Sequence, residues 1–293
     1  MVEMAPAGAT GDFQLSYAGD TFNTAYYLHA LRPDWKLDYA SRVGDDAISQ
    51  QMIDFIASHG IGVEHVLQSA GQTVGLYMIS LQDGERSFSY WRGQSAAKQL
   101  AAQDADLAAA VARADIVYFS GITLAILDAP GRARLLRAAS DARRAGAVIA
   151  FDPNLRPKLW SDNGTMCEAI MQAAAISDIV LPSHDDEATH FGDADPQATL
   201  ARYRQAGSTT IVVKNGDGPI LYSYDGGEGV FEPPAVKQVV DSTAAGDSFN
   251  AAILAGFEPA TDIGPDVEHA CALAGKVICG RGALVDLSKE VEQ

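Results

Sequence analysis

The feature that most constrains the fold of this chain is an alternation of short apolar segments with longer helical segments. The mostly apolar segments are residues 114–120, 147–151, 179–182 and 210–214. Between them lie stretches of 10–15 residues with helical periodicity, at 132–145, 165–176 and 197–206. Apolar strands that alternate with helices are typical of a parallel sheet covered on both faces. The pattern therefore predicts an α/β fold with a central, mainly parallel sheet.

The regions outside this alternation contain hairpins and further helices. Before residue 104 the sequence indicates helices at 21–31 and 48–58, and strands at 73–81 and 86–91 around the turn Gln82-Asp83-Gly84-Glu85. After residue 214 it indicates a second hairpin at 220–224 and 229–232, then helices at 244–256 and 267–279. No repeat or long linker divides the sequence, so we expect a single domain of residues 1–293.

Composition excludes several classes of partner and location. The chain has 293 residues with 21 basic and 38 acidic side chains, a net charge of −17, which argues against a nucleic-acid partner because phosphate binding needs a basic surface. No stretch reaches the ~18–20 apolar residues of a membrane span, and the first residues lack the basic and apolar regions of a signal peptide. The three cysteines, few and odd in number, indicate reduced thiols and a cytoplasmic location.

The most informative motif is the segment 241–249, in which small residues precede an apolar helical stretch. We expect the backbone N–H groups of Ala244, Ala245 and Gly246 to lie at a helix N-terminus, where they can bind phosphate. Asp247 then lies in the first turn, beside this anion hole. A carboxylate there can accept a hydroxyl proton while the amides stabilise a transferred phosphoryl group. The alternative is an ordinary helix cap with a favourable first-turn charge.

This segment resembles the C-terminal signature of the pfkB/ribokinase family of carbohydrate kinases. Residues 17–25, more than 200 positions earlier, are similar to the glycine–asparagine segment that holds sugar hydroxyls in that family. The resemblance implies a ribokinase-like three-layer sandwich with a small β lid, whose strands are inserted from about 12–19 and 63–92. It implies ATP and Mg²⁺ as cofactors and Asp247 as the base. It also implies that Gly19, Asp20 and Asn23 bind the sugar.

Within the family, four segments are similar to kinases of 2-keto-3-deoxygluconate: residues 18–28, 90–97, 152–160 and 281–283. Such a sugar acid carries a carboxylate, which a guanidinium group grips through two parallel hydrogen bonds. Arg92 on the lid hairpin and Arg156 beyond a strand end are the expected donors, and Tyr77 and Tyr90 are expected to wall the sugar. A fructokinase, a ribokinase-like enzyme and a non-catalytic sugar-binding regulator stay as alternatives.

Two loops are expected to serve the nucleotide and its metal ion. Glycines in the loop that follows residue 213 allow a nucleotide to lie close to the backbone, and the resemblance implies that this loop flanks ATP; the alternative is a plain turn. The expected nucleotide ligands are Asn154, Lys214, Gly216 and Gly218. Family members often carry an asparagine and, three residues later, a glutamate that organise Mg²⁺ through water. This chain has Ser183 and Asp186 there, with Glu187 adjacent, so either acid could serve; the alternative is an acid-rich helix N-terminus.

Three further expectations follow from the resemblance or the lid. Asp241 is expected to help hold a monovalent cation such as K⁺, with a helix cap as the alternative. The exposed strand edges of the lid favour a homodimer or higher homo-oligomer. Family members usually carry several residues before the strand that contains Val2, so the place of this first strand in its sheet is left open.

Overall fold

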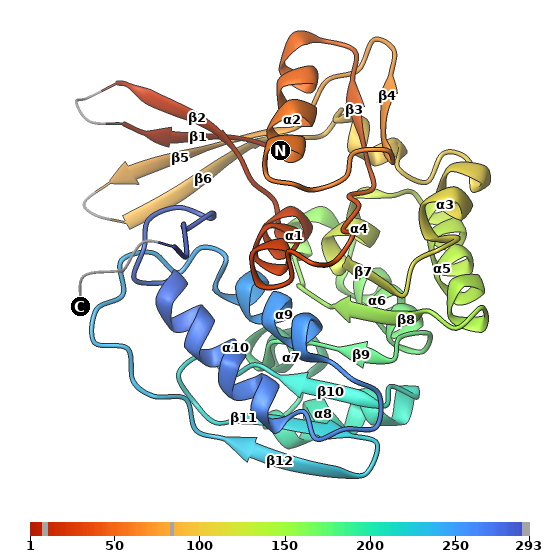
Figure 1. Cartoon of the computed structure of the whole chain (residues 1–293), viewed down its shortest axis with the longest axis vertical. Coiled ribbons are helices and arrows are strands. Elements are labelled where there is room, and N and C mark those ends of the chain that lie inside the picture. The colour runs from red at the N-terminus through yellow and green to blue at the C-terminus, as the bar shows by residue number, and fades with distance from the viewer. Residues whose placement is uncertain (8–10, 83–84, 289–293) are drawn as a thin grey trace.

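The computed structural model describes residues 1–7, 11–82 and 85–288, and in this part of the chain the strands form three sheets (Figure 1). The six-stranded sheet has the order β12-β11-β10-β9-β8-β7. Its strands are β7 (Ile116–Ser120), β8 (Val148–Asp152), β9 (Ile179–Val180), β10 (Thr210–Val213), β11 (Ile220–Tyr224) and β12 (Gly227–Phe231). Strands β7 to β10 are parallel and β11 and β12 are antiparallel. The predicted central, mainly parallel sheet is therefore confirmed.

Both faces of this sheet are buried, which is why its strands are apolar along their length. Ile149 and Phe151 of β8 pack in one hydrophobic cluster, and Ala150 between them packs in another. Neighbouring side chains of a strand point to opposite faces of the sheet. Helices α5, α6 and α8 contribute to the first cluster and α1, α9 and α10 to the second, so the molecule has three layers.

The helices begin and end close to the predicted positions. They are α1 (Asp20–Leu31), α2 (Ala47–Ser58), α3 (Asp104–Val111), α4 (Gly121–Ile126), α5 (Ala129–Arg144), α6 (Asn163–Ala174), α7 (His184–Phe191), α8 (Pro196–Ala206), α9 (Ala245–Gly256) and α10 (Gly264–Val277), with short 3₁₀ turns at Ala96–Gln99 and Pro157–Leu159. Aspartate side chains cap the first turns of α2, α5, α6 and α8, where each accepts a backbone N–H bond. The short helices α3 and α4 were not predicted from the sequence, and α7 was considered only as an alternative to a metal-binding loop.

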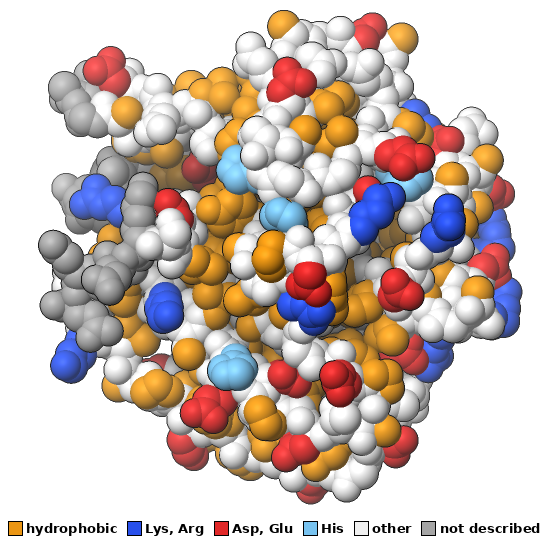
Figure 2. All heavy atoms as spheres, viewed as in Figure 1, with side chains coloured by type: hydrophobic (Ala, Val, Ile, Leu, Met, Phe, Trp, Pro, Cys, Tyr) orange, Lys and Arg blue, Asp and Glu red, His pale blue; other side chains and the backbone are white. Residues whose placement is uncertain are grey.

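The lid is a four-stranded sheet with the order β2-β1-β5-β6. Its strands are β1 (Val2–Pro6), β2 (Phe13–Tyr17), β5 (Leu76–Gln82) and β6 (Glu85–Trp91). The first strand, whose place the sequence left open, lies inside this sheet, antiparallel to β2 and parallel to β5. Figure 2 shows apolar side chains gathered where the lid joins the body of the molecule.

The boundaries expected for the lid differ from those observed. The expected range 63–92 includes β4 (Val66–Ser69), which pairs with β3 (Ser41–Gly44) in a separate two-stranded sheet. Val66 is buried in a cluster that holds Phe22 of α1 together with Val2 and Tyr17 of the lid, so β4 packs where the lid meets the body of the molecule but is not a strand of the lid sheet. Two residues of the expected hairpin turn, Asp83 and Gly84, lie outside the described residues.

Candidate active site

The carboxyl ends of the parallel strands and the N-terminus of α9 bring most of the predicted residues together. α9 begins after Ala244, which has a left-handed backbone conformation with φ 61°. The amide of Ala245 bonds to the carbonyl of Ser242 at 3.3 Å. Within the described chain, the amides of Ala244, Gly246 and Asp247 have no hydrogen-bond acceptor. A helix N-terminus with open amides is an anion-binding feature.

Asp247 is partly buried in the first turn of α9. The side-chain amide of Asn23 donates a 2.7 Å hydrogen bond to its Oδ2 atom, which joins α1 to α9 across more than 200 residues of sequence. Burial raises the pKa of Asp247 to about 7, the negative charges of Asp20 and Asp152 act in the same direction, and Asn23 and Lys214 oppose them. A carboxyl group with a pKa near neutrality is suited to general-base catalysis.

The other predicted sugar ligands of α1 form one network. The amide of Gly19 donates to Oδ1 of Asn23 at 3.2 Å. Oδ2 of Asp20 accepts hydrogen bonds from Ser120 at the end of β7 and, at 3.1 Å, from the side-chain amide of Asn154. Burial raises the pKa of Asp20, and the hydrogen bond from Ser120 opposes this shift. Asn154, expected beside the nucleotide, is thus bonded to a predicted sugar ligand.

The predicted lid residues line the face of the lid sheet that carries Glu3. The hydroxyl of Tyr77 donates a hydrogen bond to Glu3, and the rings of Tyr77 and Tyr90 are 6.0 Å apart. The guanidinium carbon of Arg92 lies 4.2 Å from the centre of the Tyr90 ring. Burial lowers the pKa of Arg92. Arg92 has no hydrogen-bond or ion-pair partner among the described residues.

Arg156 belongs to the same neighbourhood. Its Nη1 atom lies 3.6 Å from Oδ2 of Asp186 and donates to the carbonyl of Leu155. The positive charge of Arg156 lowers the pKa of both Asp20 and Arg92, so the two guanidinium groups share one electrostatic environment around Asp20. Half of the Arg156 side chain is exposed, which leaves donors available for a ligand.

Lys214 follows β10 and reaches toward α9. Its ammonium group lies 3.3 Å from Oδ1 of Asp152 and 3.1 Å from Oδ1 of Asn250. A Cβ atom placed on Gly246 would lie 3.7 Å from this ammonium group, so Lys214 is beside the open amides. The predicted glycines Gly216 and Gly218 lie in the turn between β10 and β11, where Gly216 has a φ of 57°.

The predicted metal ligands separate into different surroundings. Asp186 lies on α7 next to Arg156 and is partly exposed. Glu187 is fully buried, and both of its oxygens are engaged: one by Arg202 at 2.7 Å, the other by the hydroxyl of Tyr203 at 2.9 Å. The structure therefore does not bring Glu187 to the site. In the described ranges no group of three or more His, Cys, Asp or Glu side chains could hold a metal ion.

Asp241, the predicted cation ligand, is buried before α9. It accepts hydrogen bonds from the amide and hydroxyl of Thr243 and from the amide of Gly282 at 2.8 Å. Its carboxylate therefore organises the loop that leads into α9 and fixes it to the C-terminal segment.

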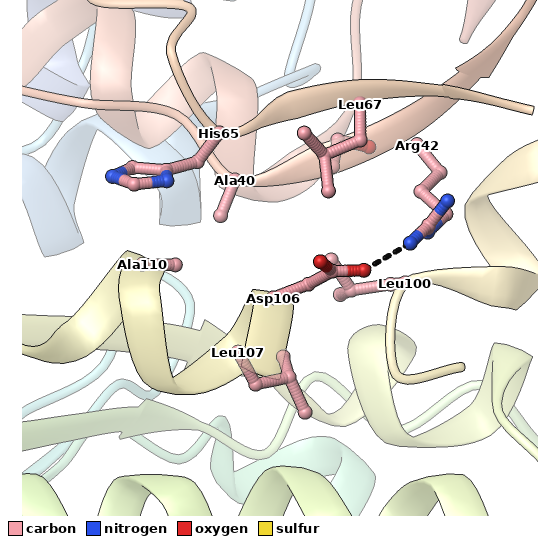
Figure 3. A pocket seen from close by; sticks show the side chains of 9 residues that line it. Ala40, Arg42, His65, Leu67, Leu100, Asp106, Leu107 and Ala110 are labelled. Atoms are coloured by element: carbon pink, nitrogen blue, oxygen red, sulfur yellow. Dashed lines mark hydrogen bonds and ion pairs between the residues drawn. The ribbon is translucent and has the colours of Figure 1, made fainter. Parts of the chain in front are cut away.

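Two hollows differ in their relation to this cluster. A cavity of about 1300 Å³ is lined in part by Gly19, Asp20 and Arg92 and by residues of α1 and β7. The small crevice in Figure 3 lies between the β3–β4 sheet and α3, where Arg42 and Asp106 form an ion pair. None of the predicted site residues lines this crevice.

Sequence reasoning missed four residues that contact the predicted ones: Glu3, Ser120, Asp152 and Asn250. Three of them had a signal. Asn250 lies three residues after Asp247, which places both on one side of a helix. Ser120 and Asp152 each end a parallel strand, where ligands bind in open α/β sheets.

Comparison with known proteins finds carbohydrate kinases among the relatives of this chain. The 2-dehydro-3-deoxygluconokinase of Escherichia coli (strain K12) is 36% identical over 297 residues, which cover 97% of this chain and 94% of the relative. The protein of the same name from Haemophilus influenzae is 36% identical over 279 residues, 92% of this chain and 88% of the relative. Among other relatives, the aminoimidazole riboside kinase of Salmonella typhimurium is 30% identical over 84% of this chain and 77% of its own.

Solved structures have the same fold. A PfkB protein from Polaromonas sp. JS666 matches with a TM-score of 0.82 and 26% identity, covering 95% of this chain and 92% of that one. The 2-dehydro-3-deoxygluconokinase of Thermotoga maritima matches with a TM-score of 0.84, covering 98% and 94%, and at 18% identity this likeness concerns the fold alone. The model of the pfkB family carbohydrate kinases matches residues 4–290. The chain therefore belongs to the pfkB family of carbohydrate kinases.

Proposed function

We propose that this chain is an ATP-dependent kinase that phosphorylates 2-keto-3-deoxygluconate (2-dehydro-3-deoxygluconate) to its 6-phosphate. The relatives at 35–36% identity that cover more than nine-tenths of this chain carry the name of this activity. A cytoplasmic location fits a protein that uses ATP and has three free cysteines.

The observation that carries the choice of substrate is the pair of guanidinium groups around Asp20. Neutral sugars offer no carboxylate, and a site for them has no need of two arginines. Arg92 comes from the lid and Arg156 from the loop after β8, so the two can approach a carboxylate from different elements. Arg92 is held against the Tyr90 ring but keeps its hydrogen-bond donors free for a carboxylate.

The reaction follows from the residues at the other end of the site. Asp247 accepts the proton of the 6-hydroxyl group as the oxygen bonds to the γ-phosphorus of ATP, while the bond from that phosphorus to the β–γ bridging oxygen breaks and ADP leaves. The open amides of Gly246 and Asp247 stabilise charge on the transferred group. A closed lid excludes water, which otherwise competes as the acceptor.

Mg²⁺ would neutralise phosphate charge during this transfer. Asp186 is the carboxylate that fits it best, because it is partly exposed beside Arg156 whereas the oxygens of Glu187 are both occupied. Mg²⁺ is commonly held by one or two carboxylates together with substrate phosphates and water, so a single acid is sufficient. Asp241 and its loop are the proposed support of a monovalent cation, which an activity comparison in K⁺ and Na⁺ buffers would test.

An ADP-release assay tests the proposal. We expect turnover with MgATP and 2-keto-3-deoxygluconate and little with fructose, ribose or gluconate. Arg92→Ala and Arg156→Ala should each raise the KM for the sugar acid roughly 10- to 100-fold, as expected for the loss of a charge-assisted hydrogen bond. Arg137→Ala, which removes a surface ion pair with Asp104, is the matched control. Preferred turnover of fructose or ribose would reject the sugar-acid assignment and keep Asp247 as the base.

The alternative of a non-catalytic sugar-binding regulator makes a different prediction. Asp247→Ala should abolish turnover and leave sugar binding by calorimetry intact if the chain is a kinase. A regulator would lack turnover before the substitution as well as after it. The retained base and open amides favour the kinase.

A homodimer that pairs the outer faces of two lids is the proposed assembly. Strand register places Phe13, Leu15 and Trp91 on the lid face opposite Tyr77, and their exposed fractions are 40%, 44% and 58%. Large apolar side chains grouped on one exposed face mark an interaction surface. Leu15→Glu should convert a dimer into a monomer in light scattering, and a monomeric wild-type chain would exclude the proposal.

A further inference from the structure

The ammonium group of Lys214 is held on two sides by buried groups that no assignment above uses. Asp152 is 3% exposed and Asn250 is fully buried, and both lie within 3.3 Å of the ammonium nitrogen. An ammonium group has three N–H donors. The third has no partner among the described residues, and a Cβ atom placed on Gly246 would lie 3.7 Å from the ammonium nitrogen.

Three hydrogen bonds fix the side chain of Asn250. Its side-chain nitrogen donates to Oδ2 of Asp152 at 2.8 Å and to the hydroxyl of Tyr118 at 3.1 Å, while its oxygen accepts from Lys214. The amide group therefore has one orientation that satisfies all of its neighbours. Asp152 uses one oxygen for Asn250 and the other for Lys214, so three side chains from β8, α9 and the end of β10 form a closed triangle.

We propose that Asp152, together with Asn250, is a positioning residue that holds the ammonium group of Lys214 at the N-terminus of α9, where the transferred phosphoryl group binds. This inference rests on the proposed kinase function for the identity of the anion. Beyond that function, it assigns Asp152 and Asn250 the role of positioning Lys214.

The physical reason is that a lysine needs such support. Its charge sits on a flexible four-carbon stem and forms no fixed fork, unlike an arginine. Electrostatic stabilisation of a transition state is effective when the charge is already in place before the reaction. The contacts with Asp152 and Asn250 hold the ammonium group of Lys214 in place before the reaction.

The triangle also keeps Lys214 away from the base. Asp247 is surrounded by Asp20 on α1, Asp152 on β8 and Lys214, and Tyr77 of the lid and Tyr118 of β7 also interact with it electrostatically. The charge of Lys214 already lowers the pKa of Asp247, and without Asp152 the ammonium group is free to move toward that carboxylate. An ion pair there would stabilise the charged form of Asp247 and weaken it as a base.

The test combines kinetics with a direct titration of Asp247. Asp152→Asn is expected to lower kcat about 10- to 100-fold, with the KM for the sugar acid changed less than about twofold. Because Asp152 acts through Lys214, the same substitution should change kcat little in a Lys214→Met background, which a double-mutant cycle measures. Equal losses in both backgrounds would overturn the proposal.

Carbon-13 NMR of the labelled Asp247 carboxyl group tests the same idea without turnover. The titration midpoint should fall by about one pH unit or more in Asp152→Asn, because a negative charge is lost and Lys214 is released. An unchanged midpoint would overturn the inference. A lack of turnover in the wild-type chain would instead reject the kinase substrate and leave this titration informative.

Asp178→Asn is the matched control. Asp178 pairs with Arg143 at 2.8 Å and accepts the amide of Ile149, but it precedes β9 and lies at the opposite end of the sheet. The Asp178→Asn substitution should lower the free energy of unfolding without moving the titration midpoint of Asp247. If Asp152→Asn does not fold, Asn250→Ala keeps both charges and their direct contact but removes the Asn250 contacts that hold each of them, and kcat should still fall. Wild-type kcat in Asn250→Ala would count against the triangle.

Discussion

Asp247 and Glu187 are two acidic groups whose pKa values burial raises to about 7, yet their surroundings have little else in common. Glu187 is fully buried and its two oxygens are occupied by Arg202 and Tyr203. Asp247 is partly buried and, within the described chain, accepts one side-chain hydrogen bond, from Asn23. The first group is enclosed by its partners, and the second keeps an oxygen open beside unpaired amides.

A raised pKa therefore reports burial and does not by itself identify a catalytic group. Glu187 packs where α7 meets α8, with Arg202 also bound to Asp193, and this arrangement holds two helices together. Asp247 lies among like charges from Asp20 and Asp152 at the ends of strands. Unused hydrogen-bonding capacity next to an anion hole is what separates a site from a structural network.

The largest expected effect is on activity. Asp247→Ala should lower kcat by about 10³-fold or more, because the 6-hydroxyl group loses its proton acceptor, while Glu187→Ala should change kcat less than about threefold at a temperature where it is folded. Steady-state ADP release from both variants measures this. A strong loss of kcat in folded Glu187→Ala would break the distinction between the two acids.

Stability should show the reverse order. Glu187→Ala leaves Tyr203 and one side of Arg202 without their partner and should lower the free energy of unfolding by about 3 kcal/mol. The folded-state pKa of Glu187 is raised, so its contribution is fully present below about pH 4.5 and is lost as pH rises through about 7. The destabilisation should therefore be larger at pH 5 than at pH 8 in urea denaturation. Equal stability of Glu187→Ala and the wild type would contradict it.

Ionisation of Asp247 should appear in both activity and stability. Because the base must be charged, kcat/KM should rise with pH through about 7. The raised pKa also affects stability. Protonated Asp247 is tolerated in its buried position, and this contribution to the free energy of unfolding is lost as pH rises through about 7. Asp247→Asn should thus be more stable than the wild type at pH 8, by on the order of 2 kcal/mol. If thermal melts at pH 8 show no higher Tm for Asp247→Asn than for the wild type, the prediction of a buried charge at Asp247 is wrong.

The smallest expected effects come from the hydrogen-bond donors of the two acids. Tyr203→Phe should lower the free energy of unfolding by about 1–2 kcal/mol and leave the pH profile of kcat/KM unchanged. Asn23→Ala removes a hydrogen-bond donor to ionised Asp247, which raises the pKa of that carboxyl group. The acid limb of the kcat/KM profile should therefore move to higher pH. An identical shift from both substitutions would show that the two acids are not independent.

The central part of the fold could be read from the sequence, and part of the site could not. The apolar strands and the small residues before α9 are local patterns, and each lies within a few residues of its predicted place. Asp186 and Glu187 are adjacent in sequence and equally acidic, so nothing local separates them. Because they occupy successive positions of α7, Asp186 faces Arg156 and Glu187 faces the core, where it contacts Tyr203. The assignments of individual residues to sugar, nucleotide and metal stay predictions.

Local sequence patterns were sufficient to predict the α/β architecture and the start of α9, where the anion hole is proposed, because hydrophobic periodicity and helix-start signals act over a few residues. Which long-range partners meet depends on the tertiary structure. It tied Asn23 to Asp247, Asn154 to Asp20, and Lys214 to a triangle with Asp152 and Asn250. These contacts join residues 36 to 224 positions apart. They depend on how the strand ends converge in three dimensions, which no local pattern specifies.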